Sequence, residues 1–471
     1  MKIARIEVKG ITCNSKSVKK GFIFVAIKGN RQDGSCFIRE ACAFGASIVV
    51  AQAKFPKLKF PEGVRFIVVK DCRRFLADAS AEFYGRPSDN IKVVGITGTN
   101  GKTTISYLIE AIAKESGSDC GVIGTINYRF KGKKIPAKNT TPGPVELQGL
   151  LAKMLAQRIS YCAMEVSSHA LVQDRVSGIN FSRAIFTNLT QDHLDYHKNL
   201  DNYFLAKAKL FRSLPPSKVA IINNDDKYSY RMKKLVRARL MSYGIRNKSM
   251  VMAKKIVSGI KGTKFILTAP GINSSIKTHL IGRYNVYNIL AAISWGLSEN
   301  LHFKDIKSAI EKFKNVPGRL ERLGYKTGLN IFVDYAHTPD ALLNVISAIR
   351  PLVSGKVIVI FGCGGERDKL KRSKMGKIVT ALADYAIITN DNPRSENPLD
   401  IIKDILKGIR KNNYCVITDR FKAIKAGLKL VKKDDCLIVA GKGHEEYQIL
   451  KNKVLHFSDQ EILHKCLQLK K

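Results

Sequence analysis

Short apolar runs alternate with longer segments of helical spacing along most of the chain. In the middle of the chain these runs span residues 91–96, 161–166, 183–187 and 218–222. The last third repeats the rhythm, with strands expected at 330–334, 356–361, 385–389, 414–418 and 436–440 and helices beginning at Pro339, Lys369, Pro398 and Arg420. Strands that alternate with helices form parallel sheets, so the pattern predicts an α/β protein.

Two segments that contain Gly and Pro interrupt this pattern, at residues 84–88 (YGRPS) and 315–318 (NVPG). Such segments are typical of linkers. The chain has 471 residues, and domains usually hold roughly 100–200 residues. We therefore expect three domains, spanning residues 1–88, 89–316 and 317–471.

Polar clusters follow the predicted strands directly. They lie at residues 98–104, 165–169, 188–193, 362–368, 391–394 and 441–445. In open parallel sheets, ligands bind beyond the carboxyl ends of the strands. The position of these clusters therefore favours an enzyme over a purely structural protein.

The first cluster has the arrangement of a phosphate-binding loop. It places Gly98, Thr99, Asn100, Gly101, Lys102, Thr103 and Thr104 between a strand and an amphipathic helix. Backbone N–H groups of such a loop can cradle phosphate, while Lys102 reaches the terminal phosphates and Thr103 binds Mg²⁺. The usual G-x-x-x-x-G-K-[ST] spacing is not met, because Ile96 stands where the first glycine should be.

The net charge points to a different class of partner. The chain has 80 Lys and Arg against 39 Asp and Glu, which gives a net charge of +41. That charge attracts polyanions, and with Lys102 it keeps open a P-loop ATPase that acts on nucleic acid. The excess is mostly lysine spread along the whole chain, so we interpret it as a solvated surface and do not expect nucleic acid as a partner.

Targeting signals and cysteines indicate the compartment. The first residues lack the apolar core of a signal peptide, and no apolar stretch is long enough to span a bilayer. The ten cysteines show no metal-binding spacing, which predicts reduced thiols. We therefore expect a soluble cytoplasmic protein with no membrane partner.

With strings farther along the chain, TGTNGKTT resembles the Mur ligase family. The strings are NTT from Asn139, AMEVSSHALVQDRV from Ala163, FTNLTQDHLDYH from Phe186, GRYNVYN from Gly282, PGRLE from Pro317, VDYAHTPDAL from Val333, FGCGGERDKLKR from Phe361, DNPRSENP from Asp391 and AGKGHEEYQ from Ala440. The resemblance covers almost the whole chain. It implies a small α/β uridine-binding domain, a central P-loop ATPase-type parallel sheet and a C-terminal Rossmann-like domain.

The resemblance also implies a reaction. The expected activity is an ATP-dependent amide ligase that adds meso-diaminopimelate to UDP-N-acetylmuramoyl-L-Ala-D-Glu in peptidoglycan precursor synthesis. The carboxylate would be activated as an acyl phosphate, with ATP and Mg²⁺ as cofactors, and we expect a monomer. Cell-wall biogenesis, cell shape and cell division are the processes that this activity would serve.

The family resemblance assigns catalytic roles to Lys102, Glu165, His193 and Lys207. From residue type alone, Glu165 and His193 could be metal ligands, although each is more often structural. In the family the matching Glu and His hold Mg²⁺ together with Thr103. The lysine that matches Lys207 is carbamylated by CO₂, which turns a cation into a carboxylate-like metal ligand; Lys209, two residues on, is the neighbouring lysine with which it could be confused.

Three further sets of residues match substrate contacts of the family. The UDP-sugar dipeptide set is Ser15, Asn139, Thr140, Thr141, Ser167, Gln173 and Arg175. The set on the nucleotide side, beyond the loop, is Asn285, Asn288, Arg319, Asp334 and His337. The diaminopimelate set is Arg367, Asp391, Asn392, Pro393, Arg394, Gly441 and Glu445.

Selection of diaminopimelate is expected to rest on two of these charges. Arg394 offers a bidentate partner for the distal carboxylate of diaminopimelate, and Glu445 one for its distal ammonium. A lysine-adding ligase or a folylpolyglutamate synthetase remains an alternative, although Arg394 and the first domain speak against both. An inactive binding protein would predict loss of Lys102, Glu165, His193 or Lys207, and all four are present.

The first domain departs from the family pattern. Asn14-Ser15-Lys16 stands where the family usually has Asp-Ser-Arg, so only Ser15 is carried over as a uridine contact.

Overall fold

The computed structural model describes residues 2–3, 6–29, 32–52, 61–323, 328–451 and 453–468. The chain forms two compact units. One unit consists of residues 1–97, 117–184 and 206–219, and the other of residues 98–116, 185–205 and 220–471. Each unit combines residues from more than one of the three predicted domains, whose boundaries stay a prediction.

The N-terminal part of the first unit is a small parallel sheet covered on both faces. Its strands, in the order β3-β4-β5-β6, are β3 (Gly10–Thr12), β4 (Phe22–Val25), β5 (Ala46–Ala51) and β6 (Arg65–Val68). Helix α1 (Ile38–Ala43) packs on one face and α2 (Cys72–Phe83) on the other. Short elements complete this part, namely β1 (Lys2–Ile3), β2 (Ile6–Glu7), η1 (Ser15–Ser17), η2 (Gly34–Phe37) and η3 (Pro87–Asp89).

The rest of the first unit holds strands in the order β10-β9-β8-β11-β7. These are β7 (Lys92–Thr97), β8 (Cys120–Ile123), β9 (Asn127–Phe130), β10 (Lys133–Pro136) and β11 (Tyr161–Glu165), with helices α4 (Pro144–Ala156) and α5 (Ser168–Val172). The register of β11 against β7 is parallel and pairs Glu165 with Ile96. Glu165 therefore lies at the carboxyl end of its strand, where the sequence predicted ligand groups.

Some elements run from one unit into the other along the chain, namely β12 (Phe181–Phe186), α7 (Leu200–Arg212) and, by its first residue, β13 (Val219–Asn223). The second unit contains the rest of β13, the strands β14 (Arg239–Gly244), β15 (Val251–Gly259), β16 (Gly262–Ala269) and β17 (Ile272–Thr278), and helices α3 (Lys102–Glu115), α6 (Leu194–His197), α8 (Ser229–Lys233), α9 (Arg283–Ser298) and α10 (Phe303–Lys312). Strands β15, β16 and β17 pair antiparallel, which the sequence interpretation did not foresee. Helix α3 packs against α9 and α10.

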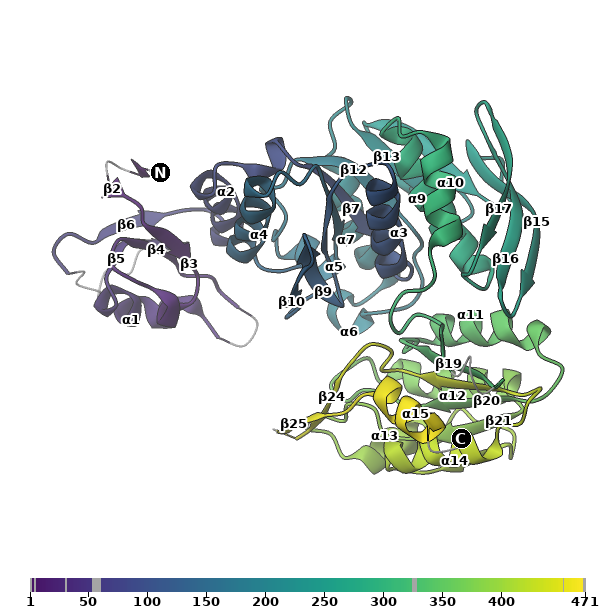
Figure 1. Cartoon of the computed structure of the whole chain (residues 1–471). Helices are drawn as coiled ribbons and strands as arrows, with labels where there is room; N and C mark the ends of the chain where they lie inside the picture. Colours follow the sequence, from purple (N-terminus) through teal and green to yellow (C-terminus); the bar gives the residue numbers. More distant parts are fainter. Residues whose placement is uncertain are drawn as a thin grey trace. The chain divides into compact units, whose positions relative to one another are not determined.

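The C-terminal part of the second unit, green to yellow in Figure 1, is a six-stranded sheet in the order β18-β19-β23-β20-β21-β22. The strands are β18 (Glu321–Leu323), β19 (Asn330–Asp334), β20 (Val357–Phe361), β21 (Tyr385–Ile388), β22 (Tyr414–Val416) and β23 (Cys436–Ala440). Beyond the sheet lie α11 (Pro339–Ile349), η4 (Arg350–Leu352), α12 (Leu370–Leu382), α13 (Pro398–Leu406), α14 (Arg420–Leu430), the hairpin β24 (Tyr447–Leu450) and β25 (Lys453–His456), and α15 (Asp459–Gln468). The five strands and four helices predicted here are confirmed within a few residues.

Alternate residues of each strand in this sheet face opposite helices. Phe332 packs with α11, α12 and α13, whereas Ile331 and Val333 pack with α14 and α15. A parallel sheet covered on both faces needs apolar residues at every position, which explains the continuous apolar runs in the sequence.

Two sequence expectations concern cysteines and membrane spans. The ten cysteines all fall within the described residues and are free thiols, as expected. Across the described part of the chain, no helix is long and apolar enough to cross a membrane.

A buried ion pair fixes the last helix to the C-terminal sheet. The guanidinium of Arg420 donates to both carboxylate oxygens of Asp459, at 2.8 and 2.7 Å, and both side chains are fully buried. Removing one partner leaves a buried charge uncompensated. Asp459→Asn should therefore lower the apparent free energy of unfolding by about 3–5 kcal/mol in urea titrations.

An exposed ion pair of the same domain is the control. Lys403 and Asp400 are 72% and 63% exposed, so Asp400→Asn should cost less than about 1 kcal/mol. Equal losses in the two variants would contradict the argument from burial.

Candidate active site

The glycine-rich loop lies between β7 and α3, as the motif predicted. Gly101 has a φ of 92°, and a Cβ at this position would come within 2.3 Å of Asn288 Oδ1. Glycine meets both demands, because it tolerates positive φ and has no Cβ. The Lys102 ammonium donates to the carbonyls of Gly98 and Thr99 at 2.9 Å each, so the lysine folds back over the loop.

Side chains from two other segments hold this loop. Thr187 Oγ1 donates to the Asn100 carbonyl at 2.7 Å, and Asn188 Oδ1 accepts from the Asn100 N–H at 2.9 Å. The Asn100 side chain donates to Asp340 in α11 at 2.8 Å, and the Thr190 hydroxyl donates to the same oxygen at 3.4 Å. Sequence reasoning missed Asp340, whose one signal is its place in the first turn of a predicted helix.

A cavity of about 300 Å³ contains two of the predicted nucleotide-side residues, Asn285 and Arg319. It is lined by Ile260, Lys261, His279, Leu280, Ile281, Asn285, Lys314, Asn315, Arg319, Leu320 and Arg322. Asn288 donates to Asn285 Oδ1 at 3.0 Å, and the Asn285 amide donates to the Ile281 carbonyl at 2.9 Å. Apolar walls with a few oriented polar groups suit a small flat ligand such as a nucleobase.

Arg319 joins the cavity to the loop. Its Nη2 donates to Thr103 Oγ1 at 3.0 Å, and its guanidinium lies over the Tyr335 ring with 4.6 Å to the centroid. The predicted loop residue Thr103 and the predicted nucleotide-side residue Arg319 therefore share one site.

Asp334 and His337 have strongly shifted pKa values next to Arg319. Burial raises the pKa of Asp334 to about 6, even though Arg319 and the Leu320 N–H, at 2.5 Å, oppose the shift. Burial also lowers the pKa of His337 to about 4, so its ring is neutral at neutral pH. The ring Nδ1 donates to the Tyr335 carbonyl at 2.7 Å, which leaves Nε2 as an acceptor.

Asp192 and His193 form a second titratable pair in this unit. The His193 N–H donates to Asp192 Oδ1 at 2.9 Å, and its ring Nε2 lies 3.3 Å from Oδ2. Burial alone would raise the pKa of Asp192, but the charges of His193 and Lys371 outweigh it and hold the pKa at about 2. Sequence reasoning missed Lys371, because it is one of many lysines and nothing in the chain marks it as buried.

In the first unit, polar side chains surround the end of β11. The Glu165 carboxylate accepts from the Thr125 N–H and hydroxyl at 2.9 Å each, and the Thr125 hydroxyl lies 3.1 Å from that of Thr140. The Thr141 hydroxyl donates to the Glu165 carbonyl at 2.8 Å and accepts from the Ser167 N–H at 3.0 Å. The predicted Glu165, Thr140, Thr141 and Ser167 are therefore brought together.

Arg175, Gln173 and Asn139 extend this cluster. Arg175 donates to the Thr141 carbonyl at 2.8 Å and to Gln173 Oε1 at 3.0 Å. The Asn139 carbonyl accepts from the Tyr128 hydroxyl at 2.7 Å. Ser15 lies in the N-terminal part of the unit, buried in η1.

The two neighbouring lysines of α7 have different environments. Lys207 is only 1% exposed. Lys209 is 48% exposed on its side chain and lies 3.8 Å from Asp174 as a surface ion pair. Burial therefore distinguishes Lys207 from Lys209, which the sequence alone could not do.

The side chains predicted to bind metal fit Mg²⁺ only in part. Carboxylate and hydroxyl oxygens are donors that Mg²⁺ prefers, and Glu165 supplies a carboxylate. His193 offers an imidazole nitrogen, which suits this ion less well. Within the described ranges, no group of three or more His, Cys, Asp or Glu side chains is placed to hold a metal. Mg²⁺ commonly takes several of its ligands from water and from phosphate oxygens.

The last predicted set gathers at the carboxyl ends of β21 and β23. Arg394 has a φ of 55°, and its Nη1 donates to the carbonyls of Gly365 and Asn392 at 2.7 and 3.3 Å. Its backbone N–H donates to Ile449 in the hairpin β24–β25 at 3.1 Å. These carbonyls are neutral, so the bonds to them do not offset the charge of Arg394. Arg367 of the same set lies exposed on the 362–368 loop.

Asp391, Gly441 and Glu445 complete the set. Gly441 has a φ of 113°, and a Cβ there would lie 2.7 Å from Asp391 Oδ2. Burial would raise the pKa of Asp391, but the charges of Lys442 and Arg420 bring it below the usual value. Pro393 is buried beside them, so the whole DNPR segment has a fixed shape.

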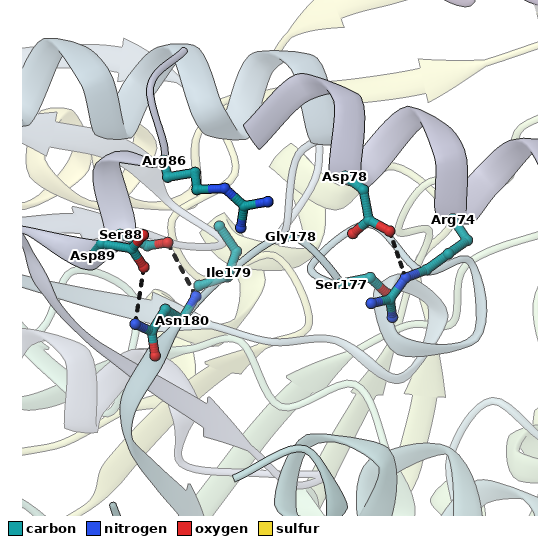
Figure 2. Close-up of a pocket in the computed structure, with 9 residues that line it drawn as sticks. All are labelled: Arg74, Asp78, Arg86, Ser88, Asp89, Ser177, Gly178, Ile179 and Asn180. Carbon is teal, nitrogen blue, oxygen red and sulfur yellow. Dashed lines mark hydrogen bonds and ion pairs between the residues drawn. The ribbon is translucent and has the colours of Figure 1, made fainter. Parts of the chain in front are cut away.

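A second cavity, of about 490 Å³, lies in the first unit at the amino ends of β7 and β12 (Figure 2). Its lining is Arg74, Asp78, Arg86, Ser88, Asp89, Ser177, Gly178, Ile179 and Asn180. Arg74 pairs with Asp78 at 2.9 Å, Arg86 pairs with Glu82, and Asn180 donates to Asp89 at 2.9 Å. Its charges are already matched, and it lies at the opposite strand ends from Glu165.

Comparison with known proteins places the chain in a family. The Mur ligase middle domain matches residues 96–296, the Mur ligase glutamate ligase domain residues 318–443, and the Mur ligase family catalytic domain residues 7–84. The chain belongs to the Mur ligase family, and the resemblance predicted from its motifs is confirmed.

Two individual relatives show which kind of Mur ligase the chain resembles. The chain is 43% identical to the UDP-N-acetylmuramoyl-L-alanyl-D-glutamate–2,6-diaminopimelate ligase of Clostridium tetani, over 98% of this chain and 95% of the relative. It is 42% identical to the ligase of that name from Bacillus velezensis, over 97% and 93%.

Solved structures agree with the fold. A structure of a ligase with the same name has a TM-score of 0.71 and 29% identity, and covers 98% of this chain and 95% of that one. The MurF ligase of Thermotoga maritima in complex with ADP has a TM-score of 0.66 and 18% identity over the full length of both chains, which shows the fold alone. The predicted three-domain α/β architecture of the family is consistent with both.

Proposed function

We propose that this protein is an ATP-dependent amide ligase that adds meso-diaminopimelate to UDP-N-acetylmuramoyl-L-Ala-D-Glu in peptidoglycan precursor synthesis. The observation that carries the proposal is the 43% identity over 98% of the chain with a ligase of that name. The arrangement of the predicted residues supports it, because each predicted substrate set except Ser15 gathers into a cluster.

The first half of the reaction activates a carboxylate. The terminal carboxylate oxygen of the dipeptide attacks the γ-phosphorus of ATP, the bond to ADP breaks, and an acyl phosphate forms. Lys102, folded over the glycine loop, would swing to the terminal phosphates and offset their charge. Asn285 and Arg319 would line the base, with Asp334 and His337 on the same side.

In the second half, the amine of the amino acid attacks the acyl carbon, loses a proton and displaces phosphate. We propose that Thr103, Glu165 and His193 hold Mg²⁺, whose charge offsets the repulsion between carboxylate and triphosphate. The Thr140, Thr141, Ser167, Gln173 and Arg175 cluster supplies hydroxyl, amide and guanidinium donors that suit the pyrophosphate and carboxylates of the UDP-sugar dipeptide.

Specificity for diaminopimelate is proposed to lie in the last cluster. Arg394 would bind the distal carboxylate of the amino acid and Glu445 its distal ammonium. Lysine has no distal carboxylate, so Arg394 would have no anionic partner with that substrate.

The proposal is tested by phosphate release from ATP with purified protein and UDP-N-acetylmuramoyl-L-Ala-D-Glu, adding meso-diaminopimelate or L-lysine in parallel. We expect release that depends on diaminopimelate. Dependence on lysine would keep the ligase and overturn the selectivity, whereas release stimulated only by DNA or RNA would overturn the reaction itself.

We also propose that Lys207 is carbamylated by CO₂. The neutral amine adds to CO₂ and loses a proton, which converts a cation into an anion. The 1% exposure of Lys207 distinguishes it from the half-exposed Lys209. Carbon-13 NMR of the protein in labelled bicarbonate should show a carbamate resonance that is absent in Lys207→Met and retained in Lys209→Met. Loss of the resonance in Lys209→Met instead would move the assignment by two residues.

The pKa of Asp334 gives a pH-dependent prediction for nucleoside binding. An ionised Asp334 can only accept hydrogen bonds, and its pKa of about 6 means that it takes up a proton as the pH falls from 7 to 5. Adenosine affinity should therefore fall about tenfold per pH unit below this pKa. The pKa values of His337 and His444, about 4 and about 3, lie below that range.

Adenosine is the right probe because it carries no phosphate that titrates in this range. Isothermal titration at several pH values measures the affinity, and Asp334→Asn should remove the dependence. A wild-type affinity that stays constant between pH 5 and 7 would contradict the assignment of Asp334 to the nucleoside.

We propose that the protein works in the cytoplasm. Its ten cysteines are free thiols, which suits a reducing compartment. Cell fractionation with an antibody would place it, and recovery outside the cytoplasmic fraction would overturn this.

A further inference from the structure

The amino-acid cluster contains a buried ammonium to which sequence motifs assign no role. The side chain of Lys442 is 0% exposed, two residues after the end of β23. Its Nζ donates to Asn392 Oδ1 at 3.0 Å and to the Tyr447 carbonyl at 2.6 Å. A buried ammonium is costly without such bonds, and an apolar side chain of equal length would fill the same space at lower cost.

Lys442 is one of two donors that set how the Asn392 amide is turned. An ammonium can only donate, so the amide oxygen must face Lys442. The same oxygen accepts from the Ile449 N–H at 3.0 Å. The amide nitrogen therefore points the other way, where it donates to Glu445 Oε2 at 2.8 Å.

The other oxygen of Glu445 is held as well. Oε1 accepts from the Tyr335 hydroxyl at 3.3 Å and from the Tyr447 hydroxyl at 3.4 Å. Burial raises the pKa of Glu445 and the nearby Asp391 adds to that effect, while the charge of Lys442 opposes it, with its Nζ 3.7 Å from Oε2. Lys442 thus favours an ionised and oriented carboxylate.

We propose that Lys442 is a positioning residue for the incoming amino acid, which fixes Asn392 so that Asn392 aims the Glu445 carboxylate at the distal ammonium of a diamino acid. The inference rests on the proposed function, because it names the group that orients one of the two selecting charges. Lys442 itself touches no substrate.

The proposed roles of Lys442 and Arg394 predict that their loss affects different substrates. Diaminopimelate and lysine both carry a distal ammonium, whereas 2-aminopimelate carries a distal carboxylate without one. Loss of Lys442 should therefore weaken the binding of diaminopimelate and lysine and leave the binding of 2-aminopimelate unchanged. Loss of Arg394 should weaken the binding of diaminopimelate and 2-aminopimelate and leave the binding of lysine unchanged.

The test compares wild type with Lys442→Met, which keeps the length of the side chain and removes its donors. We expect KM for diaminopimelate and for lysine to rise at least about tenfold, with kcat changed less than about threefold. The inhibition constant of 2-aminopimelate against diaminopimelate should change less than about twofold. The acid limb of the 1/KM profile should move to higher pH, because Glu445 loses the charge that opposes its raised pKa.

A second variant guards against misfolding. Asn392→Asp keeps the acceptors for Lys442 and Ile449 but has no donor for Glu445, so it should reproduce the rise in KM while Lys442 stays in place. The matched control is Asn413→Ala, which removes a partly buried donor to the carbonyls of Thr380 and Ala383 elsewhere in the domain. It should lower the melting temperature without changing KM.

The outcomes are distinguishable. A wild-type protein without diaminopimelate-dependent turnover would overturn the proposed function before any variant is made. A wild-type ligase whose KM is unchanged in both Lys442→Met and Asn392→Asp would overturn the inference alone. Equally weakened binding of diaminopimelate and 2-aminopimelate in either variant would show a general disturbance of the cluster. That result would also overturn the inference.

Discussion

Replacing Lys102 by alanine is expected to slow diaminopimelate-dependent phosphate release at least about a thousandfold. The reason is electrostatic. A carboxylate must approach the γ-phosphate of a triphosphate, and Lys102 supplies the positive charge at the first residue of α3. In this structure the ammonium donates to the carbonyls of Gly98 and Thr99, and the charge of a bound triphosphate would attract it to the phosphate oxygens.

Lys114→Ala is the matched control for this prediction. Lys114 lies on the same helix, exposed in its last turn. Its loss should change turnover less than about twofold, and both variants should keep the wild-type melting temperature within a few degrees. Turnover of Lys102→Ala within about tenfold of wild type would contradict the assignment of the loop to ATP phosphates.

Replacing Arg394 by asparagine should lower kcat/KM for meso-diaminopimelate at least about a hundredfold and change that for lysine less than about threefold. A guanidinium that binds a carboxylate in a desolvated site contributes several charge-assisted hydrogen bonds, whereas lysine offers no carboxylate there. Asparagine is chosen because it tolerates the φ of 55° at this position better than alanine. Product formation with each amino acid, followed by chromatography, measures the effect.

Arg410→Ala controls for loss of positive charge. Arg410 is exposed in the same domain and donates only to the Lys407 and Ile409 carbonyls among the bonds described. It should leave both amino acids unaffected. If Arg394→Asn lowered kcat/KM for lysine and for diaminopimelate equally, Arg394 would support the shape of the cluster instead of selecting the substrate.

The C-terminal sheet was predictable because its physics is local. Strands β19 and β23 begin and end at the predicted residues. The inner residues 331–333 of β19 and all five residues of β23 are apolar and buried between helices on both faces, and such runs stand out in a sequence. The antiparallel strands β15–β17 were missed for the converse reason. Several of their outward positions, such as Val257 and Lys264, are exposed, so their apolar pattern is diluted.

The candidate site could be proposed from the sequence where one motif holds several suitable groups. Gly98 to Thr104 combine a glycine loop, a lysine and a hydroxyl in one string, and Asp391 to Arg394 combine the groups proposed to select the amino acid. Residues that act through a partner distant in the chain were missed. Asp340 holds Asn100, 240 positions away, and Lys442 holds Asn392, 50 positions away.

Burial separates residues that the sequence could not distinguish. Lys207 and Lys209 are two lysines of one helix, and Lys371 and Lys442 are two among many. Only packing shows that Lys207, Lys371 and Lys442 are buried, with Lys209 on the surface. The pKa values follow from the same cause, since desolvation raises that of Asp334 and lowers that of His337.

The sequence by itself determined the α/β class and the family, and it supplied the residues that we propose carry the chemistry, because apolar periodicity and short motifs are local properties of a chain. The tertiary structure alone decided which of these residues are desolvated, and which side chains are held in a fixed orientation by hydrogen bonds to other residues. Those properties depend on groups far apart in sequence, such as Lys442, Asn392 and Glu445, and hydrogen bonds between them exist only once the sheet has brought its strand ends together.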